Sequence, residues 1–238
     1  IAVLAIGLLG IGGIWTAFHA SMFDIETFSV SGNETTPTDA IRMFLDTKVL
    51  TASLTNTFLG FQNMIAWREA SFDSSAPELP RIKHITIEKS YAARTVSVVV
   101  EERTPFGIWC GMSISSIPSC FWFDRDGVLL DQAIQASGNL IPVIHDYSGK
   151  YLKSQTKAHD PRAIKNLISV FDALRAADIA VREVRLENRE LQEVKVTLVR
   201  GPDLYFSLRF PADEAPAVIA GLRRGAGTKN PAFSSLQY

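Results

Sequence analysis

The sequence predicts an α+β fold in three parts: an N-terminal transmembrane helix over residues 1–23, a β-α-α-β-β unit over 24–102, and a mainly antiparallel β domain with helices over 103–238. Three observations support this prediction. The chain opens with a long apolar stretch, and helical and strand periods then follow one another in a compact order. In the last part, most segments alternate apolar with polar residues, as half-buried strands do.

Composition indicates a globular chain and excludes one class of partner. The 238 residues are 47% hydrophobic, with 24 basic and 25 acidic side chains. A chain of this length forms one or two domains and can build a core without cross-links or metals. Because the net charge is near zero and the one adjacent basic pair is Arg223-Arg224, nothing marks a surface for a nucleic-acid backbone. We therefore expect no nucleic acid among the partners.

The opening stretch, residues 1–18, carries no charge, and as a helix it would be roughly 27 Å long, close to the hydrocarbon thickness of a bilayer. Trp15 and Phe18 would lie at the membrane interface. Bulky residues at the cleavage positions argue against a signal peptide, and four glycines argue against a soluble core helix. The segment is therefore predicted to cross a membrane, and a cytoplasmic N-terminus is expected to precede Ile1.

The β-α-α-β-β unit begins with residues 26–31, which alternate polar with apolar side chains and stop at a Gly-Asn turn. A helix is predicted next because Pro37 stands at a first-turn position and apolar residues from Ile41 onward share one face. A second helical period covers 58–65, and turn residues fill 73–77.

The period then changes to two. Residues 85–88 and 96–101 each alternate apolar with polar side chains and predict two strands. Both helices can then cover one face of a three-stranded sheet.

The last part is predicted to be mostly strands. Residues 106–110 and 120–123 can pair as a hairpin, and Asp126-Gly127 predicts a tight turn before another strand. Residues 140–144 form a short apolar run, in which Pro142 suggests an edge position.

One long helix interrupts these strands. Asp160 is expected to cap it, Pro161 to open it, and an apolar stripe to continue to Leu174. The remaining predicted elements are strands at 181–186, 194–198 and 204–210, a short helix at 213–222, and the start of a further strand at 234–238.

The two cysteines, Cys110 and Cys120, flank the predicted hairpin loop. Two cysteines exclude a disulfide-dense scaffold and a four-cysteine zinc site. In an oxidising compartment they could bridge adjacent strands, but two unpaired thiols fit the sequence as well.

A search for reactive side chains favours a protein that is not an enzyme. The four histidines are scattered, and His84 and Glu88 are separated by roughly 13 Å if they lie on a strand, too far to share a metal. Ser154 and Lys157 match the Ser-x-x-Lys pattern of penicillin-interacting enzymes, without the companion elements of that family.

The run from Asp124 to Gly127 resembles the start of a calcium loop, but Gln135 stands where the loop needs Glu. We predict no catalytic, cofactor-binding or metal-binding residues and no cofactor.

Several short motifs, in one order along the whole chain, resemble the bacterial cell-division family FtsQ/DivIB. Residues 28–33 resemble the first strand of a polypeptide-transport-associated (POTRA) domain, and 79–87 resemble its second strand. The stretch 101–109 is similar to the family's Glu-Arg-x-Pro-x-x-x-Trp junction, and 123–128 and 140–144 are similar to its Asp-x-(Asp/Glu)-Gly hairpin and Leu-Pro strand.

The resemblance implies a non-catalytic divisome scaffold of the cell envelope, with a POTRA domain over 24–102 and an FtsQ-type β domain over 103–238. It implies a single-pass protein of the bacterial inner (plasma) membrane, anchored through residues 1–18, mostly periplasmic, at the division site. The implied partners are FtsB-like and FtsL-like subunits and other divisome proteins.

Two sets of partner-binding residues are predicted. The first is the C-terminal edge strand, which is expected to continue past the end of this chain and consists of Ser234, Ser235, Leu236, Gln237 and Tyr238. The second set lies on the POTRA strand and consists of His84, Thr86, Glu88 and Lys89.

Two alternatives remain. A POTRA-bearing protein-translocation factor would carry tandem POTRA repeats and a large barrel, and a membrane-tethered envelope hydrolase would depend on Ser154 and Lys157.

Overall fold

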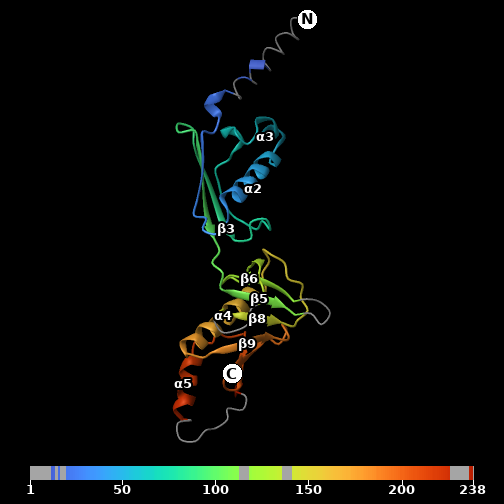
Figure 1. Cartoon of the computed structure of the whole chain (residues 1–238), viewed down its shortest axis with the longest axis vertical. Coiled ribbons are helices and arrows are strands. Elements are labelled where there is room, and N and C mark those ends of the chain that lie inside the picture. Colours follow the sequence, from blue (N-terminus) through green and yellow to red (C-terminus); the bar gives the residue numbers. More distant parts are fainter. Residues whose placement is uncertain are drawn as a thin grey trace. The chain divides into compact units, whose positions relative to one another are not determined.

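The computed structural model describes residues 12–13, 16, 20–112, 118–135, 141–225 and 236–237, with the backbone alone for 222–225 and 236–237. The chain divides into two compact units, Ile1–Arg103 and Thr104–Tyr238 (Figure 1).

The first unit is a four-stranded sheet with helices on one face (Figure 1). The strand order is β1-β4-β3-β2, in which β1 is parallel to β4 and the other neighbours are antiparallel. Its elements are η1 (Ser21–Phe23), β1 (Thr27–Ser31), α2 (Thr38–Thr51), α3 (Leu54–Leu59), η2 (Met64–Ala66), β2 (Ala70–Asp73), β3 (Ile82–Ser90) and β4 (Thr95–Glu102).

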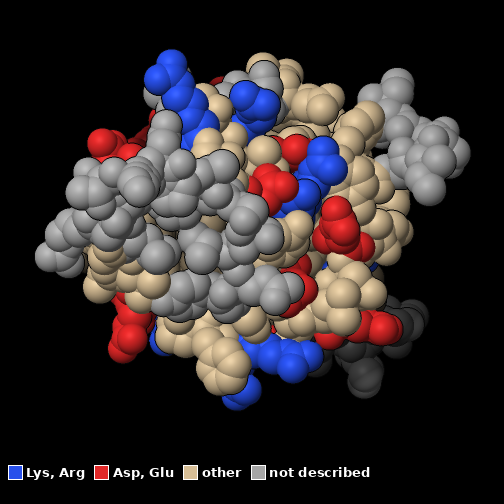
Figure 2. All heavy atoms as spheres, turned by 90° about the horizontal axis from the view of Figure 1, so that it is seen from below, with Lys and Arg blue, Asp and Glu red and all other residues tan. Residues whose placement is uncertain are grey.

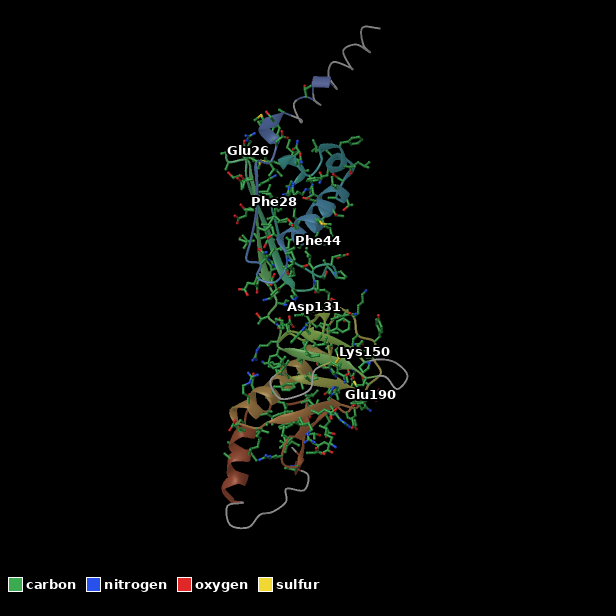
Figure 3. The ribbon with its side chains drawn as sticks, viewed as in Figure 1. Glu26, Phe28, Phe44, Asp131, Lys150 and Glu190 are labelled. Atoms are coloured by element: carbon green, nitrogen blue, oxygen red, sulfur yellow. A yellow bond between two sulfur atoms is a disulfide. The ribbon has the colours of Figure 1, made fainter. Side chains whose placement is uncertain are left out.

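The core of this unit lies between the sheet and α2. Alternate residues of β3 and β4 are buried, as the period of two predicted, and they pack against the buried face of α2. The buried side chains at this contact are Ile41, Leu45, Ile85, Ile87, Val96, Val98 and Val100. Phe28 of β1 and Phe44 of α2 border this core (Figure 3).

The second unit is an eight-stranded mixed sheet with two helices on one face (Figure 1). The strand order is β12-β11-β10-β9-β8-β5-β6-β7, and the pairs β5·β8, β8·β9 and β11·β12 are parallel. Its elements are β5 (Gly107–Gly111), β6 (Ser119–Phe123), β7 (Leu129–Gln132), β8 (Val143–Asp146), α4 (Pro161–Ala176), β9 (Val181–Leu186), β10 (Glu193–Leu198), β11 (Asp203–Ser207), α5 (Ala215–Gly225) and β12 (Leu236–Gln237).

Helix α4 organises the larger core, and its prediction from sequence is confirmed. The carboxylate of Asp160 accepts hydrogen bonds from the N–H groups of Arg162 (3.0 Å) and Ala163 (2.9 Å), and Pro161 opens the helix. The buried face of α4 packs against the inner side chains of the strands, among them Trp109 and Phe123. Ile108, Cys110 and Val143 point the other way and form a smaller apolar cluster.

The predicted membrane topology is overturned. Within the described part of the chain, no helix combines the length and the apolar character that crossing a bilayer requires. This finding contradicts the predicted transmembrane helix over 1–23 and the single-pass inner-membrane localisation that depended on it, and the described part of the chain has an α+β fold. Of residues 1–18, Gly12, Gly13 and Thr16 are described, and the rest of that prediction lies outside the described residues.

Further predictions differ from the structure. The helix predicted over 58–65 is replaced by α3 (Leu54–Leu59) and the separate turn η2 (Met64–Ala66). The first sheet has a fourth strand, β2, where only a loop from Asp73 was expected. Strand β8 lies between β5 and β9 and not at an edge. Pro142 comes one residue before β8, where its missing N–H costs no ladder bond, and its carbonyl accepts the N–H of Ile108 at 2.8 Å. The second sheet is mixed, because three of its strand pairs are parallel.

Candidate interaction surfaces

The C-terminal strand lies at an edge of the eight-stranded sheet. Leu236 and Gln237 form β12, which pairs in parallel with Leu204 and Tyr205 of β11. Among the described strands, β11 is the one neighbour of β12, so β12 lies at the edge of the sheet. Ser234, Ser235 and Tyr238 lie outside the described residues. That these residues bind a partner stays a prediction.

The predicted POTRA strand is β3, and it does not lie at an edge. Strand β2 pairs along it, with Ser71 opposite Thr86 and Asp73 opposite His84. The sequence missed β2 because its four residues, Ala-Ser-Phe-Asp, include one large apolar side chain and run directly into the expected loop. The edge of this sheet beside β3 is therefore formed by β2.

The four predicted residues of β3 do not share one face. His84, Thr86 and Glu88 alternate with buried isoleucines and point away from the helices. Lys89 points to the helix side, where its Nζ donates to the carbonyl oxygen of Trp67 at 2.8 Å and to the hydroxyl of Tyr91 at 2.9 Å. A single partner surface could include the first three, and Lys89 has a structural role.

His84 is already engaged by β2. Its Nε2 lies 2.7 Å from Oγ of Ser71, and its Nδ1 lies 2.8 Å from Oδ1 of Asp73. This hydrogen bond from His84 lowers the pKa of the Asp73 carboxyl. A partner that bound His84 would have to compete with both contacts, whereas Glu88 is exposed.

Cys110 and Cys120 are joined in a disulfide. They stand opposite one another in the antiparallel pair β5·β6, and both are buried beside Ile108 and Val143. The bridge therefore closes the hairpin over the face of the sheet opposite α4.

Ser154 and Lys157 do not form an assembled catalytic pair. The hydroxyl of Ser154 is buried and has no hydrogen-bond partner among the described residues. The side chain of Lys157 is exposed, and its backbone bridges to Val128. The stretch that resembled a calcium loop is a turn, in which the carboxylate of Asp124 accepts the N–H groups of Asp126 (3.0 Å) and Val128 (2.8 Å).

A buried polar network joins two loops of the second unit. The carboxylate of Asp146, which is 1% exposed, accepts the indole N–H of Trp109 at 3.0 Å and a hydrogen bond from the guanidinium of Arg189. Arg189 also donates to Oγ of Ser148 and to the carbonyl oxygen of Ala158. No sequence signal pointed to this network, because 43 residues separate its two charged members.

The surface charges are mixed in sign. On the face shown in Figure 2, Lys and Arg side chains are interspersed with Asp and Glu. Lys150 and Glu190 extend from the two loops that Arg189 joins (Figure 3). In the part of the chain that the structure describes, no three His, Cys, Asp or Glu side chains gather where they could hold a metal ion.

No protein-family model and no curated protein sequence matches the chain. The family resemblance therefore rests on the motifs quoted above.

Proposed function

We propose that this chain is a non-catalytic protein-interaction scaffold of the FtsQ/DivIB type, which recruits and links bacterial cell-division proteins through its two units. The observation that carries the proposal is the position of β12 at the edge of the eight-stranded sheet. An edge strand offers a row of backbone N–H and C=O groups to which an extended segment of a partner can add as a further strand.

Two further observations support an interaction scaffold. The element order β1-α2-α3-η2-β2-β3-β4 contains the predicted β-α-α-β-β order, with β2 as an additional strand. Ser154 and Lys157 are the residues that matched a catalytic sequence pattern. The Ser154 hydroxyl is buried and the Lys157 side chain is exposed, so they do not form a catalytic pair.

The test is co-purification of the chain with an FtsB-like subunit. Adjacent strand residues direct their N–H groups to opposite sides and proline has no N–H, so one of the two substitutions, proline at 236 or proline at 237, removes a donor that faces away from β11. That variant should weaken the complex at least about tenfold. Gln237→Ala is the matched control, because it keeps the backbone donor, and it should bind as the parent chain does.

Failure of the parent chain to retain the subunit would count against the proposal. Equal binding by the proline variants and the alanine control would count against strand addition as the mode of recognition.

A further inference from the structure

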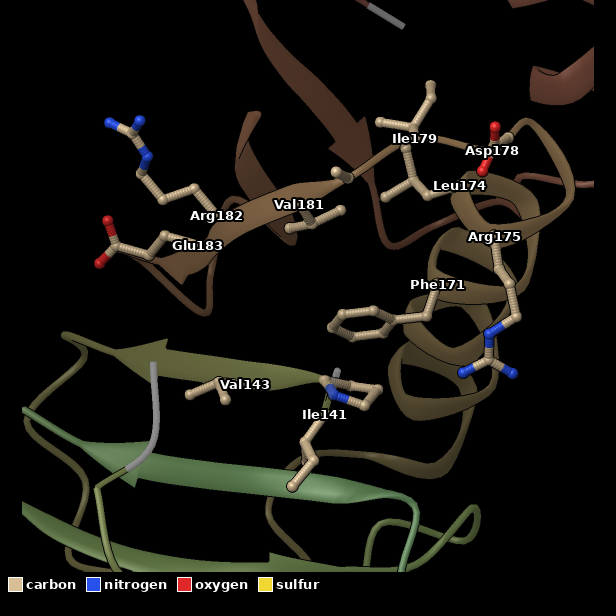
Figure 4. Close-up of a pocket in the computed structure, with 12 residues that line it drawn as sticks. Ile141, Val143, Phe171, Leu174, Arg175, Asp178, Ile179, Val181, Arg182 and Glu183 are labelled. Carbon is tan, nitrogen blue, oxygen red and sulfur yellow. The ribbon is translucent and has the colours of Figure 1, made fainter. Parts of the chain in front are cut away.

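A groove lies in the second unit between the last turn of α4 and the first residues of β8 and β9 (Figure 4). We call it the α4–β9 groove. Its cavity holds about 430 Å³. This volume falls in the range of roughly 300–1,000 Å³ typical of ligand pockets.

The groove opens because two strands pair over only part of their length. The register between β8 and β9 begins with Ile144 opposite Val184. The residues before them do not pair with one another, and the end of α4 borders the space that remains. Asp178, with φ of +53°, turns the chain from the helix into β9.

The inner walls of the groove are apolar. Phe171 and Leu174 come from α4, Ile179 and Val181 from the approach to β9, and Val143 from β8 (Figure 4). An entering apolar side chain that packs against these residues is stabilised by removing apolar surface from water. The interior therefore favours an aliphatic or aromatic side chain.

Two arginines stand on opposite sides of the opening (Figure 4). The side chain of Arg175 is 66% exposed, and its contact with Asp172 is long, at 4.0 Å. Asp172 instead pairs with both terminal nitrogens of Arg125, at 3.0 and 3.2 Å. The Arg175 guanidinium therefore keeps most of its donors for another partner.

Arg182 is similarly open. Its one hydrogen bond in the described part of the chain is a long one, 3.5 Å, to the carbonyl oxygen of Val199. Two carboxylates line the groove, those of Asp178 and Glu183. Glu183 forms an ion pair with Arg185 at 2.9 Å, so Asp178 is the one lining carboxylate outside that pair. The rim therefore favours a partner with carboxylates, which guanidinium groups bind through paired hydrogen bonds.

We propose that the α4–β9 groove binds a short segment of a partner protein, which inserts a Leu- or Phe-sized side chain between Phe171 and Val181 and directs acidic side chains to Arg175 and Arg182. The inference rests on the scaffold function proposed above and adds to it the chemistry of one partner segment. The groove uses β8, β9 and α4, and strand addition would use β12.

The direct test uses three synthetic peptides and methyl-labelled full-length chain. The first has a central Leu-Phe pair flanked by Asp and Glu, the second has the same pair flanked by Gln and Ser, and the third has Ser-Ser flanked by Asp and Glu. The first should shift the methyl resonances of Val143, Leu174 and Val181. The second should bind at least about tenfold more weakly because the rim contacts are lost, and the third should cause no shift there. Equal binding of all three, shifts confined to other residues, or no shift with the first peptide would overturn the proposal.

Variants locate the site. The double change Arg175→Glu and Arg182→Glu should reduce binding of the first peptide at least about tenfold. Ala180→Trp, at an exposed position that lines the groove, should block it sterically. Arg209→Glu is the matched control, because it reverses an exposed charge away from the groove lining, and it should leave binding unchanged. Thermal melting of each variant separates loss of binding from loss of folding, and unchanged binding by folded groove variants would contradict the proposal.

The two proposals fail separately. If no FtsB-like subunit co-purifies, the scaffold function fails, and the peptide shifts still decide the groove. If the subunit co-purifies with the parent chain and the peptides cause no groove shifts, the groove inference alone fails.

Discussion

The carboxylate of Glu102, at the end of β4, accepts hydrogen bonds from Thr35, at 3.0 Å from the backbone N–H and 2.6 Å from the hydroxyl. Its other oxygen accepts the N–H of Thr36 at 2.8 Å. One acidic side chain thus holds the turn between β1 and α2 against the last strand of the same sheet. Partial burial alone would raise the pKa of Glu102, but these hydrogen bonds outweigh it and lower the pKa to about 2.

A pH dependence follows. Because the folded-state pKa of Glu102 is below its unfolded value, the stabilisation is complete above about pH 4.5 and is lost as pH falls toward about 2. Glu102→Gln should cost about 1 kcal/mol at pH 7, a figure reduced for solvent screening of this partly exposed group. Urea unfolding at pH 7 and pH 3 measures it, and the difference between parent and variant should shrink at the lower pH. Glu88→Gln, an exposed carboxylate of the neighbouring strand, is the control and should change little at either pH.

The buried pair Asp146–Arg189 predicts a larger effect. Asp146→Ala leaves the Arg189 guanidinium with 18% side-chain exposure and without its carboxylate, which should cost about 3–5 kcal/mol. Asp172→Ala breaks an exposed pair with Arg125 and should cost about 1 kcal/mol or less. Urea unfolding of both variants compares the two losses in free energy of unfolding. Similar losses would show that the buried Asp146–Arg189 pair contributes no more than the exposed one.

Gly127 combines a left-handed backbone with close packing. Its φ is +75°, and a Cβ there would lie 2.6 Å from Cγ1 of Ile164 in α4. Gly127→Ala should therefore cost about 2–4 kcal/mol, the sum of backbone strain and overpacking. Gly149 has nearly the same φ, +74°, but open space around the Cβ position, so Gly149→Ala should cost only about 1 kcal/mol. Thermal or urea unfolding tests this order. Equal losses of stability for the two variants would show that the close contact with Ile164 does not contribute.

The disulfide closes a short loop in the β5·β6 hairpin. Cys110 and Cys120 have a sequence separation of 10. Removal of the disulfide by a double Cys→Ala change should cost about 2–3 kcal/mol through the gain in unfolded-state entropy. Urea unfolding of the parent chain should become reductant-sensitive by a similar amount, and the double variant should not respond to reductant. If the stability of the double variant also changed with reductant, the effect would have a cause other than this disulfide.

Much of each unit could be predicted because the relevant signals are local. The Asp160-Pro161 start of α4 depends on hydrogen bonds within one turn of helix, and the alternation around Ile85 depends on the two-residue period of a strand. The same period already separates Lys89 from His84, Thr86 and Glu88, so grouping them on one surface overlooked information in the sequence.

Other features had no local signal. Strand β2 is recognisable only through its pairing with β3, because four mostly small or polar residues carry little strand character by themselves. The Asp146–Arg189 pair and the α4–β9 groove each bring together residues that are distant in sequence. The predicted transmembrane helix rested on the apolar character of residues 1–18 alone, and no helix in the described part of the chain has the length and apolar character to support it.

The sequence by itself determined most of the helices and strands, the faces that α4, β3 and β4 bury, and an α+β fold for the described part of the chain, because capping and periodicity act between neighbouring residues. The tertiary structure decided which strands form the edges, which charges are buried, and where β8 and β9 separate to leave a groove. Those outcomes depend on which distant segments pair, and pairing is decided by assembly of the whole sheet around its core.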